Sequence, residues 1–414
     1  MQSTELIPHL FRTEYSRITA VLCKFFGIEY LQLAEDVASD TFLMATETWG
    51  IKGLPANPQA WLYTVAKNKA RDVLKRNKIF TGKISPELQK NTALYIEKEI
   101  DLSEQNIEDS QLQMMFTICD PCLSSEAQIG LSLRILCGFG IDEIAAAFLT
   151  GKETINKRLF RAKEKLRSEK IAILFPGAAE IEPRLANVLT TLYLLFNEGY
   201  YSASPHTTLR KELCIEAMRL AHILTNNELT DKPEVNALLS LMCFHASRFD
   251  ARINDAGEII LYEEQDTALW NDELIAKGEM YLNKASAGRQ LSKYHLEAAI
   301  AYWHTVREDS IEKWETILQL YNRLLQIAYS PVAALNRTYA LAKANGPAAA
   351  IAAAEKLGLS NSHFYHSLLA ELYKNIDAVK ALLHLQQALS LTTSAADKKI
   401  ILNRIELLSK IKQP

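Results

Sequence analysis

The chain has 414 residues, of which 48% are hydrophobic, and its formal net charge is −3. At about 100–200 residues per domain, this length predicts two to four domains with packed cores. No apolar run approaches the ~18 residues needed to cross a membrane, and the N-terminus lacks the layout of a signal peptide, so we expect a cytoplasmic protein. Of the six cysteines, only Cys119 and Cys122 have C-x-x-C spacing. With no second pair beside them, we interpret them as structural thiols and expect no metal or cofactor.

The N-terminal part predicts three helices. Apolar residues at helical spacing run from 6 to 26 and stop at Gly27, and a second helix is expected over 31–49. Val37 and Phe42 lie on the expected inner face of this second helix. Its outer face is expected to carry Glu35, Asp36, Asp40 and Glu47. Two glycines and two prolines predict a loop over 50–58, and Pro58 suits the first turn of the third helix.

A block of positive charge follows on the third helix. Between 67 and 83, seven basic residues stand against Asp72 alone, which makes a net charge of +6. The basic residues are Lys67, Lys69, Arg71, Lys75, Arg76, Lys78 and Lys83. Beside exposed aromatic residues and the polar Asn68, this block suits phosphate contact and base stacking. The plainer interpretation is a solvated helix end, because lysine is common near helix C-termini.

The charge then reverses. Between 84 and 125, eight acidic residues stand against Lys90 and Lys98, which makes a net charge of −6. Few apolar residues are periodic before Leu112. We therefore expect residues 81–110 to be a flexible or partly helical acidic linker between two basic modules.

Residues 141–167 indicate two short helices joined by a tight turn. Ile144 and Phe148 lie on one apolar face of the first helix, and Thr150 with Glu153 predicts a capping box that starts the second helix near Gly151. The inward face of the second helix carries Ile155, Leu159, Ala162 and Leu166. Its outward face carries Asn156, Lys157, Arg161 and Glu164. This layout is that of a helix-turn-helix whose second helix enters the DNA major groove. The alternative is an ordinary helix pair with a solvated basic face.

Two basic helical modules joined by an acidic linker resemble a bacterial sigma-70 type RNA polymerase sigma factor of the extracytoplasmic-function group. The segment 35–42 is similar to that family's core-polymerase-binding helix, and 61–68 is similar to the segment that opens the promoter. The resemblance implies a non-enzymatic, all-α protein whose partners are bacterial core RNA polymerase and promoter DNA. It divides the chain into region 2 (1–80), the linker (81–110), a region 4 helix-turn-helix (111–172) and a C-terminal extension (173–414).

The extension resembles that of one sigma-factor subgroup in particular. The segments that carry this likeness are 192–200, 264–266, 294–299 and 330–337. That subgroup has a large tetratricopeptide-like (TPR-like) extension and is often encoded beside small DGPF-domain proteins, which makes such a protein a candidate partner. Relatives tend to show a Cys-His-Pro pattern where this chain has Cys119-Asp120-Pro121-Cys122, so no role of that histidine carries over.

The residues of the extension predict helices throughout, interrupted at glycines and prolines. The expected breaks lie at 176–177, 204–205, 232–233, 256–257, 287–288, 330–331, 346–347 and 358. Leu335 with Leu369 and Tyr339 with Tyr373 are pairs 34 residues apart, which is the tetratricopeptide period. We therefore expect a helical repeat array with a concave face for partners, regulatory in role and packed against one or both DNA-binding modules.

An enzymatic or metal-binding role for the extension has weak support. His304 and Glu308 are four residues apart and are expected on one helix face, but no third ligand has readable spacing, so we interpret them as a structural pair. We interpret Trp270, Trp303 and Trp314 as core or interface anchors.

The resemblance assigns roles to individual residues. Core-polymerase contact is expected from Glu35, Asp36, Asp40 and Phe42. Contact with the minus-ten element, where a loop over 52–57 cradles a flipped base, is expected from Lys52, Asn57, Trp61, Lys67, Asn68, Arg71, Lys75 and Arg76. Contact with the minus-thirty-five element is expected from Lys152, Thr154, Asn156, Lys157, Arg158 and Arg161. Two alternatives stay open: a stand-alone helix-turn-helix transcriptional regulator with a sensory or scaffolding repeat domain, and a scaffold whose basic helices are merely solvated.

Overall fold

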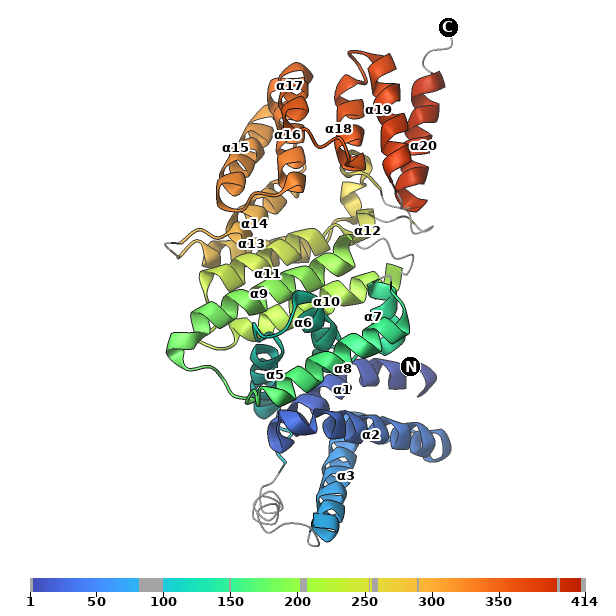
Figure 1. The fold of residues 1–414 in the computed structure, drawn as a ribbon, viewed down its shortest axis with the longest axis vertical. Helices are drawn as coiled ribbons and strands as arrows, with labels where there is room; N and C mark the ends of the chain where they lie inside the picture. The colour runs from blue at the N-terminus through green and yellow to red at the C-terminus, as the bar shows by residue number, and fades with distance from the viewer. Residues whose placement is uncertain are drawn as a thin grey trace. The chain divides into compact units, whose positions relative to one another are not determined.

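The computed structural model describes residues 3–81, 100–148, 150–201, 207–252, 254, 260–288, 290–392 and 395–410. Every regular element within these ranges is helical (Figure 1), which confirms the all-α prediction. None of the described helices has the length and apolar character needed to span a membrane. The chain forms two compact units: unit 1 holds Met1–Ser204 with Ile215–Thr230, and unit 2 holds Pro205–Cys214 with Asp231–Pro414.

Unit 1 begins with the first module, which consists of α1 (Ser3–Phe26), η1 (Ile28–Tyr30), α2 (Leu31–Lys52) and α3 (Pro58–Thr81). Gly27 ends α1 with a φ of 97°, a backbone conformation that glycine adopts without steric cost. The helix α2 continues through Gly50 and ends only where Gly53 adopts a φ of 77°. The predicted loop over 50–58 is therefore too long at its start, and Lys52 lies in the last turn of α2 rather than in a loop.

The second module consists of α5 (Glu104–Ile118), α6 (Ser125–Leu131), η2 (Ser132–Leu136), α7 (Ile141–Ala147) and α8 (Lys152–Ser168). The helix α5 begins at Glu104, so the end of the range assigned to the linker is helical. Residues 82–99, with Lys83 among them, lie outside the described residues, and the side chain of Lys78 is also not described.

Two helices of the C-terminal extension complete unit 1: α9 (Ala178–Tyr201) and the latter part of α10 (Thr207–Thr225). Asp120, which is buried, pairs with Arg184 of α9 at 3.2 Å. Thr191 of α9 donates a hydrogen bond to Gln128 of α6 at 2.8 Å. Arg219 of α10 donates to the carbonyl oxygen of Leu136 at 2.8 Å. The start of the extension is therefore packed on the second module, as expected.

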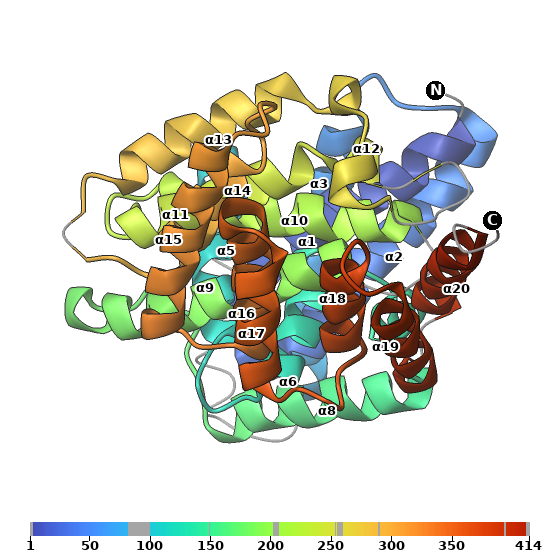
Figure 2. The same cartoon turned by 90° about the horizontal axis from the view of Figure 1, so that it is seen from above.

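Unit 2 holds the first part of α10, up to Cys214, and then the helical elements that follow Asp231. In chain order they are α11 (Pro233–Ala246), α12 (Phe249–Arg252), η3 (Tyr262–Glu264), η4 (Thr267–Leu269), α13 (Asp272–Ala285), α14 (Lys293–Trp303), α15 (Ile311–Ile327), α16 (Pro331–Asn345), α17 (Pro347–Leu357), α18 (His363–Tyr373), α19 (Ala378–Leu391) and α20 (Ala395–Lys410). Seen from above, α18, α19 and α20 lie in a row (Figure 2), and buried residues of α18, α19 and α20 form one core cluster.

Most predicted breaks in the extension coincide with helix ends. Pro233, Pro331 and Pro347 each occupy the first position of a helix, where a missing N–H costs nothing. The breaks at 204–205 and 256–257 lie outside the described residues. The predicted helical pair of His304 and Glu308 is wrong, because α14 ends at Trp303 and Glu308 follows in the connection to α15.

Candidate nucleic-acid and polymerase interface

The outward face of α3 is basic. Asn68, Arg71, Lys75 and Arg76 are exposed, and Lys67 is half-buried. Buried Leu62, Ala66, Ala70 and Leu74 recur every four residues on the other face and hold the helix to its module. The structure therefore presents a row of cations along one helix, on the side that the apolar pattern leaves to water.

Two residues assigned to base contact have structural partners. The Asn57 side chain accepts a hydrogen bond from the backbone N–H of Ala60 at 3.0 Å, which caps the first turn of α3. The ring of Trp61 packs edge-on against Trp49 of α2, with a centroid distance of 5.3 Å. These contacts fix the segment between α2 and α3.

The outward face of α2 is acidic, but not in all the expected positions. Asp36 and Asp40 are exposed, and Asp40 lies 3.7 Å from the ammonium group of Lys69 on α3. Glu35 and Phe42 are buried. The prediction of an outward Glu35 is wrong, because a second surface covers this side of α2.

That covering surface belongs to the second module. The carboxylate of Glu35 accepts a hydrogen bond from Arg134 Nε in η2 at 3.0 Å, and it also pairs with Lys163 of α8. Arg134 further donates to the carbonyl oxygen of Phe139 and to the hydroxyl of Tyr15. Burial, followed by the charge of Glu35, raises the pKa of Tyr15 to about 12. We call Glu35, Arg134, Lys163 and Tyr15 the charge cluster.

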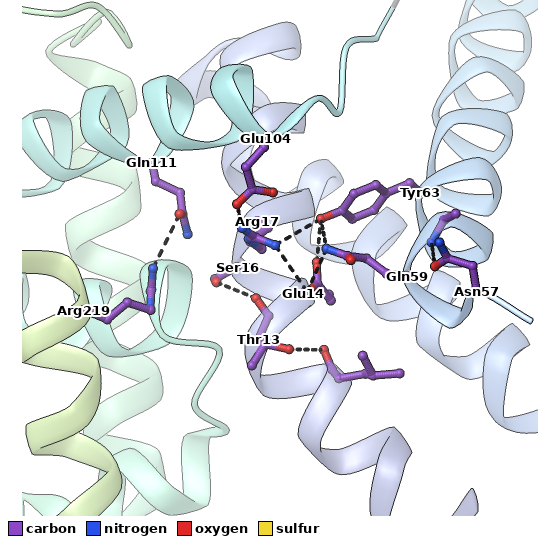
Figure 3. A network of polar contacts seen from close by, with 12 residues as sticks. Thr13, Glu14, Ser16, Arg17, Asn57, Gln59, Tyr63, Glu104, Gln111 and Arg219 are labelled. Atoms are coloured by element: carbon purple, nitrogen blue, oxygen red, sulfur yellow. Dashed lines mark hydrogen bonds and ion pairs between the residues drawn. The ribbon is translucent and has the colours of Figure 1, made fainter. Parts of the chain in front are cut away.

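A second polar network lies on α1 (Figure 3). Buried Glu14 accepts hydrogen bonds from Tyr63 at 2.6 Å and from Gln59 at 3.3 Å, both on α3. Arg17 reaches Glu14 and Tyr63 and also pairs with Glu104 at the start of α5. Burial, followed by the hydrogen bond to Glu14, raises the pKa of Tyr63. The two modules are thus joined through α1 as well as through Glu35.

The helix α8 has the two faces that its sequence predicts. Its inward residues are at most 4% exposed: Ile155, Leu159, Ala162 and Leu166. Its exposed residues include Lys152, Thr154, Asn156, Lys157 and Arg161. Arg158 is half-buried, with its guanidinium 5.2 Å from the centroid of the Phe148 ring.

The predicted capping box at the start of α8 is wrong. Gly151 is the N-cap residue, and no side chain caps it. Glu153 instead pairs with Lys157 one turn later, at 2.6 Å, and Lys152 pairs with Asp142 of α7 at 2.7 Å. Because these ion pairs are exposed, they stabilise the helix little.

Comparison with known proteins identifies the first module. Residues 10–79, which span α1 to α3, match the family Sigma-70 region 2. Residues 184–286 match a family of unknown function, DUF6596. The chain is 33% identical over 387 residues to the uncharacterized protein R00370 of Rhizobium meliloti (strain 1021), and the alignment covers 92% of this chain and 90% of that protein. The chain belongs to the family of that protein. No solved structure matches it.

The sigma-70 region 2 domain supports a sigma-70 family factor, with a role in RNA polymerase binding and transcription initiation. Sigma-70 factors are not enzymes, which is consistent with the expectation for this chain. Sequence reasoning missed Arg134 and Lys163 as partners of Glu35, and Tyr15 as a partner of Arg134. No local sequence pattern indicates these contacts, because the three residues lie on three different helical elements.

Proposed function

We propose that the protein is a sigma factor of the extracytoplasmic-function group that binds core RNA polymerase and directs promoter-specific initiation. The observation that carries this proposal is the region 2 match over α1–α3, on helices that expose carboxylates on α2 and cations on α3. Asp36 and Asp40 would bind a basic surface of the polymerase. Arg71, Lys75 and Arg76 would bind phosphates near the minus-ten element.

The pair α7–α8 would read the minus-thirty-five element. Its exposed polar residues Thr154 and Asn156 have the chemistry to contact base edges, whereas Lys152, Lys157 and Arg161 would position the helix on phosphates. Support comes from the amphipathic burial of α8, which leaves these side chains on one solvent-facing side.

This function requires the two modules to separate. Elements centred near minus ten and minus thirty-five are about 25 base pairs apart, or roughly 85 Å at 3.4 Å per base pair. In unit 1 the two modules share ion pairs at Glu35 and at Arg17. Binding both elements at once would therefore require the two modules to move apart from the docked arrangement that these ion pairs hold. The docked arrangement would therefore be the form that is not bound to a promoter.

The rest of the proposal concerns the extension. Leu335 and Tyr339 on α16 correspond to Leu369 and Tyr373 on α18 at a spacing of 34 residues, and α16–α17 and α18–α19 are successive helical pairs. These features support a TPR-like array, and a small DGPF-domain protein is the candidate partner for it. Its role would be regulatory.

In vitro transcription tests the proposal. Full-length protein added to bacterial core polymerase should give promoter-dependent transcripts from its own promoters, and Asp36→Arg should reduce co-purification with core polymerase at least tenfold. Glu279→Arg, an exposed acid-to-base change on α13, is the matched control and should have no effect. Failure of the wild type to bind core polymerase, together with binding of duplex DNA by the protein alone, would instead support a stand-alone regulator.

A further inference from the structure

Unit 2 contains a group of side chains that the proposed function does not use. They surround the ring of Tyr262 in η3. Arg248, between α11 and α12, has its guanidinium carbon 5.3 Å from the ring centroid, and Lys313 of α15 has its ammonium nitrogen 5.6 Å from it. The rings of Trp270, His304 and Trp314 also contact Tyr262, at centroid distances of 5.0 to 6.5 Å. Residues far apart in the chain thus meet at one point.

The two cations in this group are buried. Arg248 is 6% exposed and Lys313 is 2% exposed. Among the residues that the structure describes, neither forms an ion pair with a carboxylate. Lys313 donates hydrogen bonds to neutral acceptors, the carbonyl oxygen of Val306 at 2.7 Å and the hydroxyl of Tyr262 at 3.1 Å. A buried charge is costly unless it is paired, and a contact with an aromatic ring repays only part of that cost.

The neighbouring carboxylates already have other partners. Glu263 pairs with Lys343 at 2.9 Å and accepts a hydrogen bond from Tyr339. Asp309 lies 3.5 Å from the same lysine and accepts a hydrogen bond from the indole N–H of Trp314. Burial lowers the pKa of Lys313, with Asp309 opposing this effect and Arg248 and Lys343 adding to it. Three cations, Arg248, Lys313 and Lys343, therefore face only two carboxylates, and both carboxylates lie against Lys343, so the group keeps one positive charge in excess.

Unused hydrogen-bond donors lie in the same place. Arg248 Nε, Trp270 Nε1 and His304 Nδ1 are buried and have no hydrogen-bond partner among the described residues. The first two are donors only, and the neutral imidazole donates from Nδ1 in one of its tautomers. Burial, with the charges of Arg248 and Lys313, lowers the pKa of His304 to about 3, so the ring is neutral at physiological pH. Since buried polar groups are normally satisfied, the cluster lacks an acceptor.

We propose that Arg248 and Lys313, with Trp270 and His304 beside them, form a binding site for a small organic anion that carries a carboxylate or phosphate group. Such a group supplies both the missing negative charge and the missing acceptors. Because both cations are buried, the surface of a folded protein could not reach them, and we therefore exclude such a protein as the ligand. The rings of Trp270 and Trp314 pack against Tyr262 and form the apolar border of this group of cations. This site is independent of the sigma-factor proposal.

Thermal unfolding of the full-length protein tests the site, with sodium phosphate and sodium benzoate as probes and sodium chloride at equal ionic strength as reference. At about ten times its Kd, a probe that binds should stabilise the folded protein by about 1.4 kcal/mol and raise the Tm of the whole chain by roughly 2 °C over chloride. Tryptophan fluorescence should change with the same concentration dependence, because two indoles line the site. A response to phosphate or to benzoate distinguishes the two anionic groups. Absence of a response to both would overturn the proposal.

Substitutions sharpen the test. Without probe, Arg248→Met should keep or raise the Tm, because it removes a buried charge that has no partner, and it should abolish the response to the probe. Lys313→Met should abolish the response as well. Lys343→Met removes a neighbouring cation that has its own carboxylates, and it should keep the response. If Arg248→Met unfolds the protein or lowers the Tm by more than Lys343→Met does, the guanidinium has a structural role and the proposal fails.

Discussion

Removal of the Lys163 ammonium group should weaken the docking of the two modules in unit 1. Lys163 and Arg134 share the buried carboxylate of Glu35, whose side chain is 3% exposed. Lys163→Met deletes one of these two charged partners and preserves most of the side chain's length. A hydrogen bond to a charged group contributes about 1.5–3 kcal/mol, and loss of a partner leaves charge buried without compensation.

This free energy should appear with opposite signs in two measurements. The stability of the free protein should fall by about 1.5–3 kcal/mol in urea denaturation, because the docked form loses the contact. If core polymerase binds only the separated form, its apparent affinity should rise by up to about 10–150-fold, since the competent fraction of the protein increases by the same factor. Fluorescence anisotropy with labelled core polymerase measures the second quantity.

Arg167→Met is the matched control for this prediction. Arg167 lies on the same helix and pairs with Glu164 at 3.3 Å, but both side chains are at least half exposed. Removal of this surface pair should change stability by no more than about 1 kcal/mol and leave polymerase affinity unchanged. If Lys163→Met lowers stability while affinity stays the same or falls, docking does not oppose polymerase binding and the reasoning is refuted.

Three further predictions concern DNA binding, thiol reactivity and pH. For promoter binding by the holoenzyme, Arg71→Ala and Arg76→Ala should each reduce the slope of log Kobs against the logarithm of the salt concentration by roughly 0.7–0.9. Unchanged slopes would exclude phosphate contact by these two side chains. Burial, followed by a hydrogen bond with Asp120, raises the pKa of the Cys122 thiol to about 11. Iodoacetamide should therefore label Cys122 about 100-fold more slowly than an ordinary thiol, and rapid labelling at neutral pH would contradict this. His304 remains neutral in the folded protein down to a pKa of about 3, whereas the unfolded chain takes up this proton near pH 6.5. Stability should therefore fall by about 1 kcal/mol per pH unit from this group as the pH drops below 6.5, and His304→Gln should reduce that slope in urea denaturation at pH 5–7.

The sequence alone was sufficient for the features that depend on local pattern. The apolar period of 155–166 predicted which face of α8 is buried, and proline and glycine positions predicted most helix ends in the extension. The basic face of α3 follows in the same way, because buried residues at helical spacing leave the intervening cations to solvent. These features need no knowledge of what else packs nearby.

The tertiary structure decided the features that depend on distant neighbours. Glu35 has the sequence context of an exposed acid, yet it is buried because residues about a hundred positions later supply its counter-charges. The same holds for Tyr262, Arg248 and Lys313, which meet only through the packing of separate helices. Helical periodicity shows which side of a helix is apolar, but it does not show whether another part of the chain covers the polar side. The tertiary fold determines this, because it brings together surfaces of complementary charge and shape from distant parts of the sequence.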